Sequence, residues 1–238
     1  MGISAGPSGV SDGLVFQLDA SNLRSYSGSG LTANGLVGGI GGTLVNGTGF
    51  SSSNNGSFFF DGTNDYISLP NPNLLAFGTN SFSIDFWLYS TYVYPGSGVV
   101  YRTILSSYDN YNGDFNTYFY LGLFNFAGYG LTNTVGLLDS TGNYFNASFG
   151  VNISINEWTY VAFTRSGNNL ICYKNGSFFA SESRANNFSG TRNARIGGGV
   201  EQVNTFQGSI SLMKIYNRAL SDTEIQQNFN AMRERYNL

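Results

Sequence analysis

The sequence contains no histidine, a single cysteine and few charged residues, with 11 Lys and Arg against 14 Asp and Glu in 238 residues. Without an imidazole, acid–base chemistry and nucleophilic catalysis by Ser or Cys lack their usual partner. The lone Cys172 excludes an internal disulfide, and its apolar neighbours Ile171 and Tyr173 indicate a buried thiol rather than a redox site. These absences argue against an enzyme.

The formal net charge is −3, and the basic residues are dispersed along the chain. Because a nucleic-acid backbone is bound by clustered Lys and Arg, we expect no nucleic acid partner. The apolar runs fall short of the roughly 18 residues that a membrane span requires, so we expect no membrane partner either. The start, Met1 to Pro7, also lacks the basic and apolar pattern of a secretory signal.

The abundant residues are typical of β-structure: 32 Gly, 20 Phe and 16 Tyr. Apolar and other residues alternate in segments such as 14–19 and 82–89, and a period of two places one face of a strand on the core. In 82–89 the even positions face the core, and the odd positions, which include Asp85 and Trp87, face the other side. For Trp87 and Trp158 we expect core or inter-sheet packing.

Turn residues indicate how these strands are connected. Residues 58–60 and 66–69 flank a turn at 61–65, which predicts a hairpin. The pair Asn175 and Gly176 fits a type I′ turn and predicts a second hairpin. The Gly-rich stretch 27–49 predicts an irregular excursion with at most one short strand near 43–45.

The end of the chain predicts one helix. Ser221 and Glu224 form a capping box for a helix over about 221–235, which we expect to pack on the sandwich edge or on a partner. Many short strand signals followed by one helix predict an all-β fold, a two-sheet antiparallel β-sandwich with one C-terminal α-helix. We expect a flexible leader at 1–12 and a single domain over 13–238.

Several blocks of the sequence resemble, in order, successive strands and the closing motif of the concanavalin A-like lectin/glucanase family, which includes laminin G-like domains. This resemblance implies a jelly roll with two facing sheets. The leader and residues 228–236 are similar to versions found in structural proteins of tailed phages, which implies a virion protein. The blocks are Gly13–Ala20, Phe60–Ile67, Ser81–Leu88, Glu157–Ala162, Phe206–Ile210 and Ile215–Ile225.

Catalytic relatives carry a Glu-x-Asp-x-x-Glu strand for glycoside hydrolysis, and this sequence has no such strand. Glu157, Glu182 and Glu201 are separated from one another in the sequence. The resemblance therefore implies binding rather than catalysis, and we expect no catalytic residues.

Asp61, Asn64 and Asp65 place oxygen-bearing side chains in one turn, which makes calcium a candidate ligand. The alternative is an Asx-rich turn whose side chains satisfy their own backbone. Relatives commonly hold calcium with acidic residues that this sequence lacks at 31–39 and 210–212. No cofactor is otherwise required.

Tyrosine and amide side chains are concentrated in two loops at about 91–101 and 107–117. Rings can serve as apolar platforms for sugars, while Asn and Asp pair with hydroxyls. The same residues could equally be subunit contacts, because Tyr is enriched at protein interfaces. The candidate carbohydrate- or partner-binding residues are Tyr92, Tyr94, Tyr108, Asn110, Tyr111, Asn112 and Asp114.

The first functional hypothesis is a non-enzymatic phage virion protein, such as a capsid decoration or fibre-associated module. It would bind other virion proteins or copies of itself, touch a host-surface glycan, and be located on the virion after assembly in the host cytoplasm. The alternative is a bacterial carbohydrate-binding lectin module, located outside the cell or at its surface. A stable oligomer without sugar favours the first hypothesis, and glycan binding by a monomer favours the second.

Overall fold

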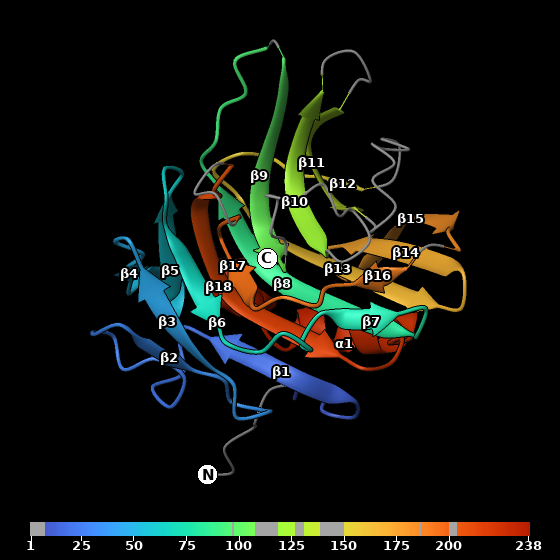
Figure 1. The fold of residues 1–238 in the computed structure, drawn as a ribbon, viewed down its shortest axis with the longest axis horizontal. Helices are drawn as coiled ribbons and strands as arrows, with labels where there is room; N and C mark the ends of the chain where they lie inside the picture. Colours follow the sequence, from blue (N-terminus) through green and yellow to red (C-terminus); the bar gives the residue numbers. More distant parts are fainter. Residues whose placement is uncertain are drawn as a thin grey trace.

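The computed structural model describes residues 8–96, 98–107, 119–126, 131–138, 150–185, 187–199 and 204–238. Two large antiparallel sheets, which we call sheet A and sheet B, enclose one core between them (Figure 1). The predicted all-β sandwich with one C-terminal α-helix is therefore confirmed. No helix in the described part of the chain is both long enough and apolar enough to cross a membrane.

Sheet A consists of β1 (Leu14–Asp19), β4 (Gly49–Ser51), β5 (Ser57–Asp61), β8 (Phe82–Ser90), β13 (Trp158–Ser166), β14 (Asn169–Lys174), β15 (Ser177–Ser183) and β18 (Gln207–Tyr216). The strands follow the order β15-β14-β13-β8-β18-β5-β4, and β1 also pairs with β18. β18 therefore contacts β8 along one edge and both β1 and β5 along the other.

Sheet B consists of β2 (Thr32–Asn34), β3 (Gly41–Val45), β6 (Tyr66–Leu69), β9 (Val99–Ser106), β10 (Tyr120–Phe126), β11 (Leu131–Leu138), β12 (Val151–Asn152) and β17 (Ala194–Ile196). Its order is β12-β11-β10-β9-β17-β6-β3-β2. A small separate ladder pairs β7 (Ala76–Gly78) with β16 (Phe188–Ser189). The helical elements of the described residues are η1 (Ser53–Asn55), α1 (Asp222–Asn230) and η5 (Arg233–Tyr236).

The core between the sheets follows the predicted alternation. In β8 the four even positions, Phe82, Ile84, Phe86 and Leu88, are fully buried in the core cluster. Residues Leu121 and Leu123 of β10 meet them from the opposite sheet. Cys172 is buried in the same cluster, as predicted, and burial raises the pKa of its thiol to about 12.

The hairpin predicted at 58–69 is wrong. β5 pairs with β18 and β4 in sheet A, whereas β6 pairs with β17 and β3 in sheet B. The turn at 61–65 therefore crosses between the two sheets. Phe60 and Ile67 both face the core, but from opposite sides. The same turn residues suit a hairpin and a crossing between sheets, so local sequence could not distinguish them.

The hairpin predicted at Asn175 and Gly176 is confirmed: β14 and β15 pair with Lys174 opposite Ser177. Both turn residues have positive φ, 49° for Asn175 and 77° for Gly176, as a type I′ turn requires. The prediction of at most one short strand in 27–49 is wrong. β2 and β3 form there, and β4 begins at its end, because short ladders with the edges of both sheets satisfy the backbone of this Gly-rich stretch.

The C-terminal helix lies on the outer face of sheet A, not on an edge of the sandwich. Ile225 and Phe229 of α1 pack on a second apolar cluster that includes Trp87, Tyr160 and Tyr216. Trp87 stacks on Phe229 with ring centroids 5.7 Å apart. Trp87 is thus buried as predicted, but beneath the helix rather than between the sheets.

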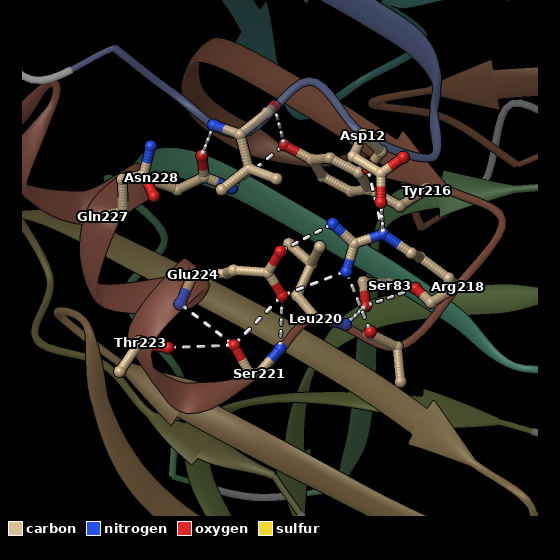
Figure 2. A network of polar contacts seen from close by, with 12 residues as sticks. Asp12, Ser83, Tyr216, Arg218, Leu220, Ser221, Thr223, Glu224, Gln227 and Asn228 are labelled. Carbon is tan, nitrogen blue, oxygen red and sulfur yellow. Dashed lines mark hydrogen bonds and ion pairs between the residues drawn. The ribbon is translucent and has the colours of Figure 1, made fainter.

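A polar network fixes the start of α1 to the sheet (Figure 2). The Arg218 guanidinium pairs with the Glu224 carboxylate, with an Nη2–Oε1 distance of 2.6 Å, and holds the pKa of Glu224 down at about 2. The Ser221 N–H donates to Glu224 Oε2 at 2.9 Å, completing the predicted capping box. Ser83 Oγ of β8 donates to the Arg218 carbonyl at 2.9 Å and accepts from the Leu220 N–H at 2.8 Å.

The described part of the predicted leader, residues 8–12, packs against this helix. Val10 is 8% exposed, and its N–H donates to Asn228 Oδ1 at 2.7 Å. Gln227 Nε2 donates to the carbonyl of Ser8 at 2.7 Å. The segment before β1 and the segment after β18 therefore cover the same face of sheet A.

Candidate functional site

The two sheets have different outer faces. On sheet A, Trp87, Tyr160 and Tyr173 lie in the cluster beneath α1 and are at most 1% exposed. The α-helix of the described residues lies on sheet A and not on the outer face of sheet B. Several outward side chains of sheet B remain partly or fully exposed, and among them we call the following group the open face: Thr43, Tyr66, Ser68, Tyr101 and Arg195.

Strand pairing aligns the open face. Arg195 of β17 lies opposite Ser68 of β6, and Ser68 lies opposite Thr43 of β3. The next residues along two of these strands, Ile196 and Ile67, point into the core. Because alternate residues of a strand face opposite sides, the polar side chains form a row on the outside.

The Arg195 guanidinium lies over the Tyr66 ring, 4.4 Å from its centroid. Nη1 of Arg195 also donates to the carbonyl of Gly199 at 2.9 Å, which fixes the plane of the guanidinium. Gly198 approaches so closely that a Cβ there would come within 2.8 Å of the Tyr66 Cβ. The ring and the cation are thus held by backbone on rigid strands.

The same outer face continues across β9 and β10, where it becomes buried. Tyr120 is 8% and Phe124 2% exposed. The Tyr101 ring meets the Phe124 ring edge-on at a centroid distance of 5.9 Å, and Thr103 Oγ1 donates to the Tyr120 hydroxyl at 3.1 Å. Tyr101 is therefore positioned by aromatic neighbours while part of its own surface stays exposed.

Arg102 connects two groups of predicted site residues. Its guanidinium lies 4.2 Å from the centroid of the Tyr92 ring, and Nη1 donates to the carbonyls of Gly62 and Thr205 at 3.3 and 3.4 Å. Tyr92 is 7% exposed, so its ring packs against the cation and the core. Tyr94 is partly exposed, and its hydroxyl donates to a backbone carbonyl of its own loop at 2.7 Å.

The turn at 61–65 uses its acidic side chains to satisfy its own backbone. Asp65 Oδ2 accepts from the Asp61 N–H at 2.9 Å, and Asp61 Oδ1 accepts from the Thr63 N–H at 2.7 Å. Asn64 contributes its carbonyl, which accepts from Asn46 Nδ2 at 3.0 Å. Burial raises the pKa of Asp65, and its Oδ1 has no hydrogen-bond partner among the described residues.

The described residues contain no cluster of three or more His, Cys, Asp or Glu side chains that could hold a metal ion. A cation at the turn would therefore depend on the remaining oxygens of Asp61 and Asp65 together with backbone carbonyls. Such carboxylate and carbonyl donors are the type that calcium prefers.

A buried polar cluster lies beneath α1, away from the open face. Asn228 Nδ2 donates to Asp85 Oδ2 at 2.8 Å and to the Tyr216 hydroxyl at 3.0 Å, and Lys214 Nζ donates to Asn228 Oδ1 at 3.3 Å. Burial raises the pKa of Asp85 to about 6, and the charge of Lys214 opposes this shift. These groups hold the helix on sheet A, on the opposite side of the sandwich from the open face of sheet B.

The remaining predicted site residues, Tyr108, Asn110, Tyr111, Asn112 and Asp114, lie outside the described residues. Tyr66 and Arg195, in contrast, were missed by sequence reasoning. The alternation around Ile67 could have placed Tyr66 on an outer face, but nothing near Arg195 in the sequence indicates that β17 lies beside β6.

The two facing antiparallel sheets define a protein of the concanavalin A-like class. The sequence comparison agrees with this assignment. The family model of the concanavalin A-like lectin/glucanases superfamily matches residues 61–226. The chain therefore belongs to this superfamily, and the resemblance to it seen in the sequence is confirmed. No curated protein is significantly similar to the chain in sequence.

Solved structures share the fold at low identity. Domain 4 of AbnA, an extracellular arabinanase from Geobacillus stearothermophilus solved with arabinotriose, has a TM-score of 0.64 and 16% identity over 90% of this chain and 97% of that chain. The botulinum neurotoxin serotype G binding domain has a TM-score of 0.62 and 16% identity over 91% and 50%. A Trypanosoma rangeli sialidase mutant has a TM-score of 0.64 and 14% identity over 94% and 34%.

The chain thus spans about half of the toxin domain and about a third of the sialidase. At these identities the likeness shows the fold alone. Because the superfamily includes both lectins and glucanases, the function has to be argued from the site.

Proposed function

We propose that this domain is a non-catalytic module that recognises glycans with its open face. The observation that carries the proposal is a partly exposed row of side chains on sheet B, in which Tyr66, the Arg195 guanidinium and the hydroxyls of Ser68 and Thr43 stand on rigid strands. Rings offer apolar contact to sugars, and guanidinium and hydroxyl groups bind sugar hydroxyls. The arabinotriose complex of the similar AbnA domain supports this reading.

The absence of acids from sheet B supports a non-catalytic role. Glycoside hydrolysis requires two carboxylates roughly 5–9.5 Å apart across the scissile bond. None of the strands β2, β3, β6, β9, β10, β11, β12 and β17 contains Asp or Glu. Of the described acids, Asp85 is held beneath α1 by Asn228, and Glu224, in the first turn of α1, pairs with Arg218.

A glycan array probed with the wild-type domain, carrying neutral oligosaccharides such as arabinotriose and sialylated ones, tests the proposal. Tyr66→Ala should weaken binding of at least one of the bound glycans by about tenfold, because one ring contact and its hydrogen bonds are lost. Phe59→Ala is the matched control, since Phe59 is a partly exposed aromatic on the outer face of sheet A. Equal binding by the Tyr66 variant and the wild type would refute the site.

A structural role on a phage particle is a second proposed function. Phe178 and Phe179 are 58% and 42% exposed on β15, the strand at the free edge of sheet A. An edge strand with exposed aromatic side chains can pair with another chain. The location would then be a virion, whereas the glycan-binding proposal alone suits an extracellular or cell-surface location.

Size-exclusion chromatography with light scattering tests this second proposal. The wild-type domain should form a stable oligomer in the absence of sugar, and Phe178→Ser should dissociate it. If the wild-type domain stays monomeric at high concentration, the assembly role is refuted, and the glycan-binding proposal is unaffected.

Calcium at the 61–65 turn remains a prediction from the sequence, supported by the unpartnered Asp65 Oδ1. A bound cation would stabilise the charged Asp65 carboxylate and so oppose the effect of burial, which raises the pKa of this group. Calcium should therefore raise the thermal midpoint of the wild type but not of Asp61→Asn. An unchanged wild-type midpoint in excess calcium would contradict it.

A further inference from the structure

A groove distinct from the open face runs along one side of the sandwich. It has a volume of about 620 Å³ and lies between the start of β1, the loop before β3, the segment 71–81 and the residue after β18. This volume is within the range of roughly 300–1,000 Å³ typical of small-molecule sites. The groove is thus large enough for a short saccharide.

Side-chain amides dominate its polar lining: Asn71, Asn73, Asn80 and Asn217 all border the groove. Asn71 Oδ1 is occupied, since it accepts from the Asn73 N–H at 2.9 Å. The side chains of Asn73, Asn80 and Asn217 are exposed and make no hydrogen bond to another described residue. Each free amide offers both donors and an acceptor, a combination that matches a sugar hydroxyl.

The backbone that carries these amides is already satisfied. The N–H of Asn80 donates to the Phe77 carbonyl at 3.0 Å, and the N–H of Asn217 donates to the Gly13 carbonyl at 2.9 Å. Phe77 itself is 9% exposed and packs in the core, where it stacks on Phe82. The backbone walls of the groove are therefore held in place, and only the amide side chains have to be ordered when a ligand binds.

The groove is electrically neutral. None of its lining residues is charged. Arg218 follows Asn217 in sequence, but its guanidinium is paired with Glu224 at 2.6 Å and Asp12 at 2.8 Å. An anionic sugar such as a sialic acid would find no cation here, whereas the apolar wall formed by Val15, Ile40 and Phe77 suits the C–H face of an uncharged sugar ring.

We propose that this groove, through Asn73, Asn80 and Asn217, is a binding site for neutral saccharides that is separate from the open face. The inference rests on the proposed glycan-binding function and adds to it a ligand class and a second site. Two sites on one domain would let it hold a branched or repeating glycan at two points.

The test compares three variants by isothermal titration calorimetry with neutral trisaccharides of glucose, xylose, galactose and mannose, and with sialyllactose. The groove variant Asn73→Ala/Asn80→Ala/Asn217→Ala should bind the preferred neutral trisaccharide at least about tenfold more weakly than the wild type. The open-face variant Tyr66→Ala should keep groove binding within about twofold. Asn168→Ala/Gln226→Ala, which removes two exposed amides elsewhere, is the matched control.

The outcomes separate the groove from the open face, and loss of binding in both variants or in neither overturns the separate groove site. Loss of binding in the groove variant alone supports the inference. Loss only in the Tyr66 variant overturns the groove site but keeps the glycan-binding function. A preference for sialyllactose overturns the neutral ligand class, and the absence of binding to every saccharide overturns both the inference and the proposed function. Thermal unfolding of each variant verifies that these exposed substitutions leave the fold intact.

Discussion

The outer faces of the two sheets differ in how far their side chains are exposed to solvent. Beneath α1, sheet A presents aromatic and charged side chains that are completely shielded, including Trp87 and Asp85. On sheet B, Tyr66 and Arg195 remain partly exposed and meet across two strands. Both faces carry aromatic residues at alternating positions, so the difference lies in what covers them. Aromatic residues outside a sandwich therefore indicate a docking surface, and only the tertiary structure tells whether the chain itself occupies it.

Substitution of Trp87 should give the largest effect. Trp87→Ala removes an indole that packs on Tyr160, Phe229 and Tyr236, and should lower the free energy of unfolding by about 3–5 kcal/mol. On the open face, Arg195→Ala should cost only about 0.5–1 kcal/mol, the value of an exposed cation–π pair. Urea unfolding of both variants measures the difference. Equal losses of unfolding free energy in the two variants would show that the two outer faces are equally buried.

The buried cluster should show the next largest effect. Asn228→Ala would leave the Val10 N–H and an Asp85 oxygen without partners, at a cost of about 2–3 kcal/mol. Its neighbour Gln227 is exposed and donates to the Ser8 carbonyl, so Gln227→Ala should cost less than about 1 kcal/mol. Thermal unfolding compares the two. Similar midpoints for both variants would mean that the cluster does not hold the helix.

Two serines, one on each sheet, should show the same difference in stability with smaller losses. Ser83→Ala removes the hydroxyl that bridges the Arg218 carbonyl and the Leu220 N–H, and should cost about 1–2 kcal/mol. Ser68→Ala on the open face should change the stability by less than about 0.5 kcal/mol. Chemical denaturation gives both values, and a larger loss for Ser68 would reverse the assignment of the faces.

The two acids near α1 should respond to pH in opposite directions. The folded pKa of Asp85 is raised to about 6, so its contribution to stability is present below about pH 4 and is lost as the pH rises through 6. The folded pKa of Glu224 is lowered to about 2, so its contribution is present above pH 4.5 and is lost as the pH falls toward 2. These shifts should appear as slopes in stability measured against pH.

Two variants separate these slopes. Glu224→Gln keeps a side chain able to cap the helix but removes the charge, so the loss of stability between pH 4.5 and 2 should become shallower. Asp85→Asn should flatten the slope between pH 4 and 6 instead. A wild-type profile that is flat in both windows would contradict both assignments.

Sequence reasoning recovered the elements that depend on local periodicity and failed where a distant strand chose the partner. The alternation in β8 and the Asn175 turn are local signals, and the structure confirms both. The turn at 61–65 has the same residues whether its strands pair or separate, and it crosses between the sheets. The candidate site has the same character, because Tyr66 meets Arg195 only through the pairing of β6 with β17.

The superfamily motifs and the period-two pattern were enough to determine an all-β sandwich with a capped C-terminal helix, since each depends on side chains close together in the chain. Which face that helix covers, and which face stays open, was decided by packing between segments far apart in sequence. The helix settles where Trp87, Tyr160 and Tyr216 offer it apolar contact and Asp85 and Lys214 offer polar partners. Tyr66 and Arg195 on the opposite sheet stay partly exposed because the described helix packs where these apolar and polar partners occur together, on sheet A.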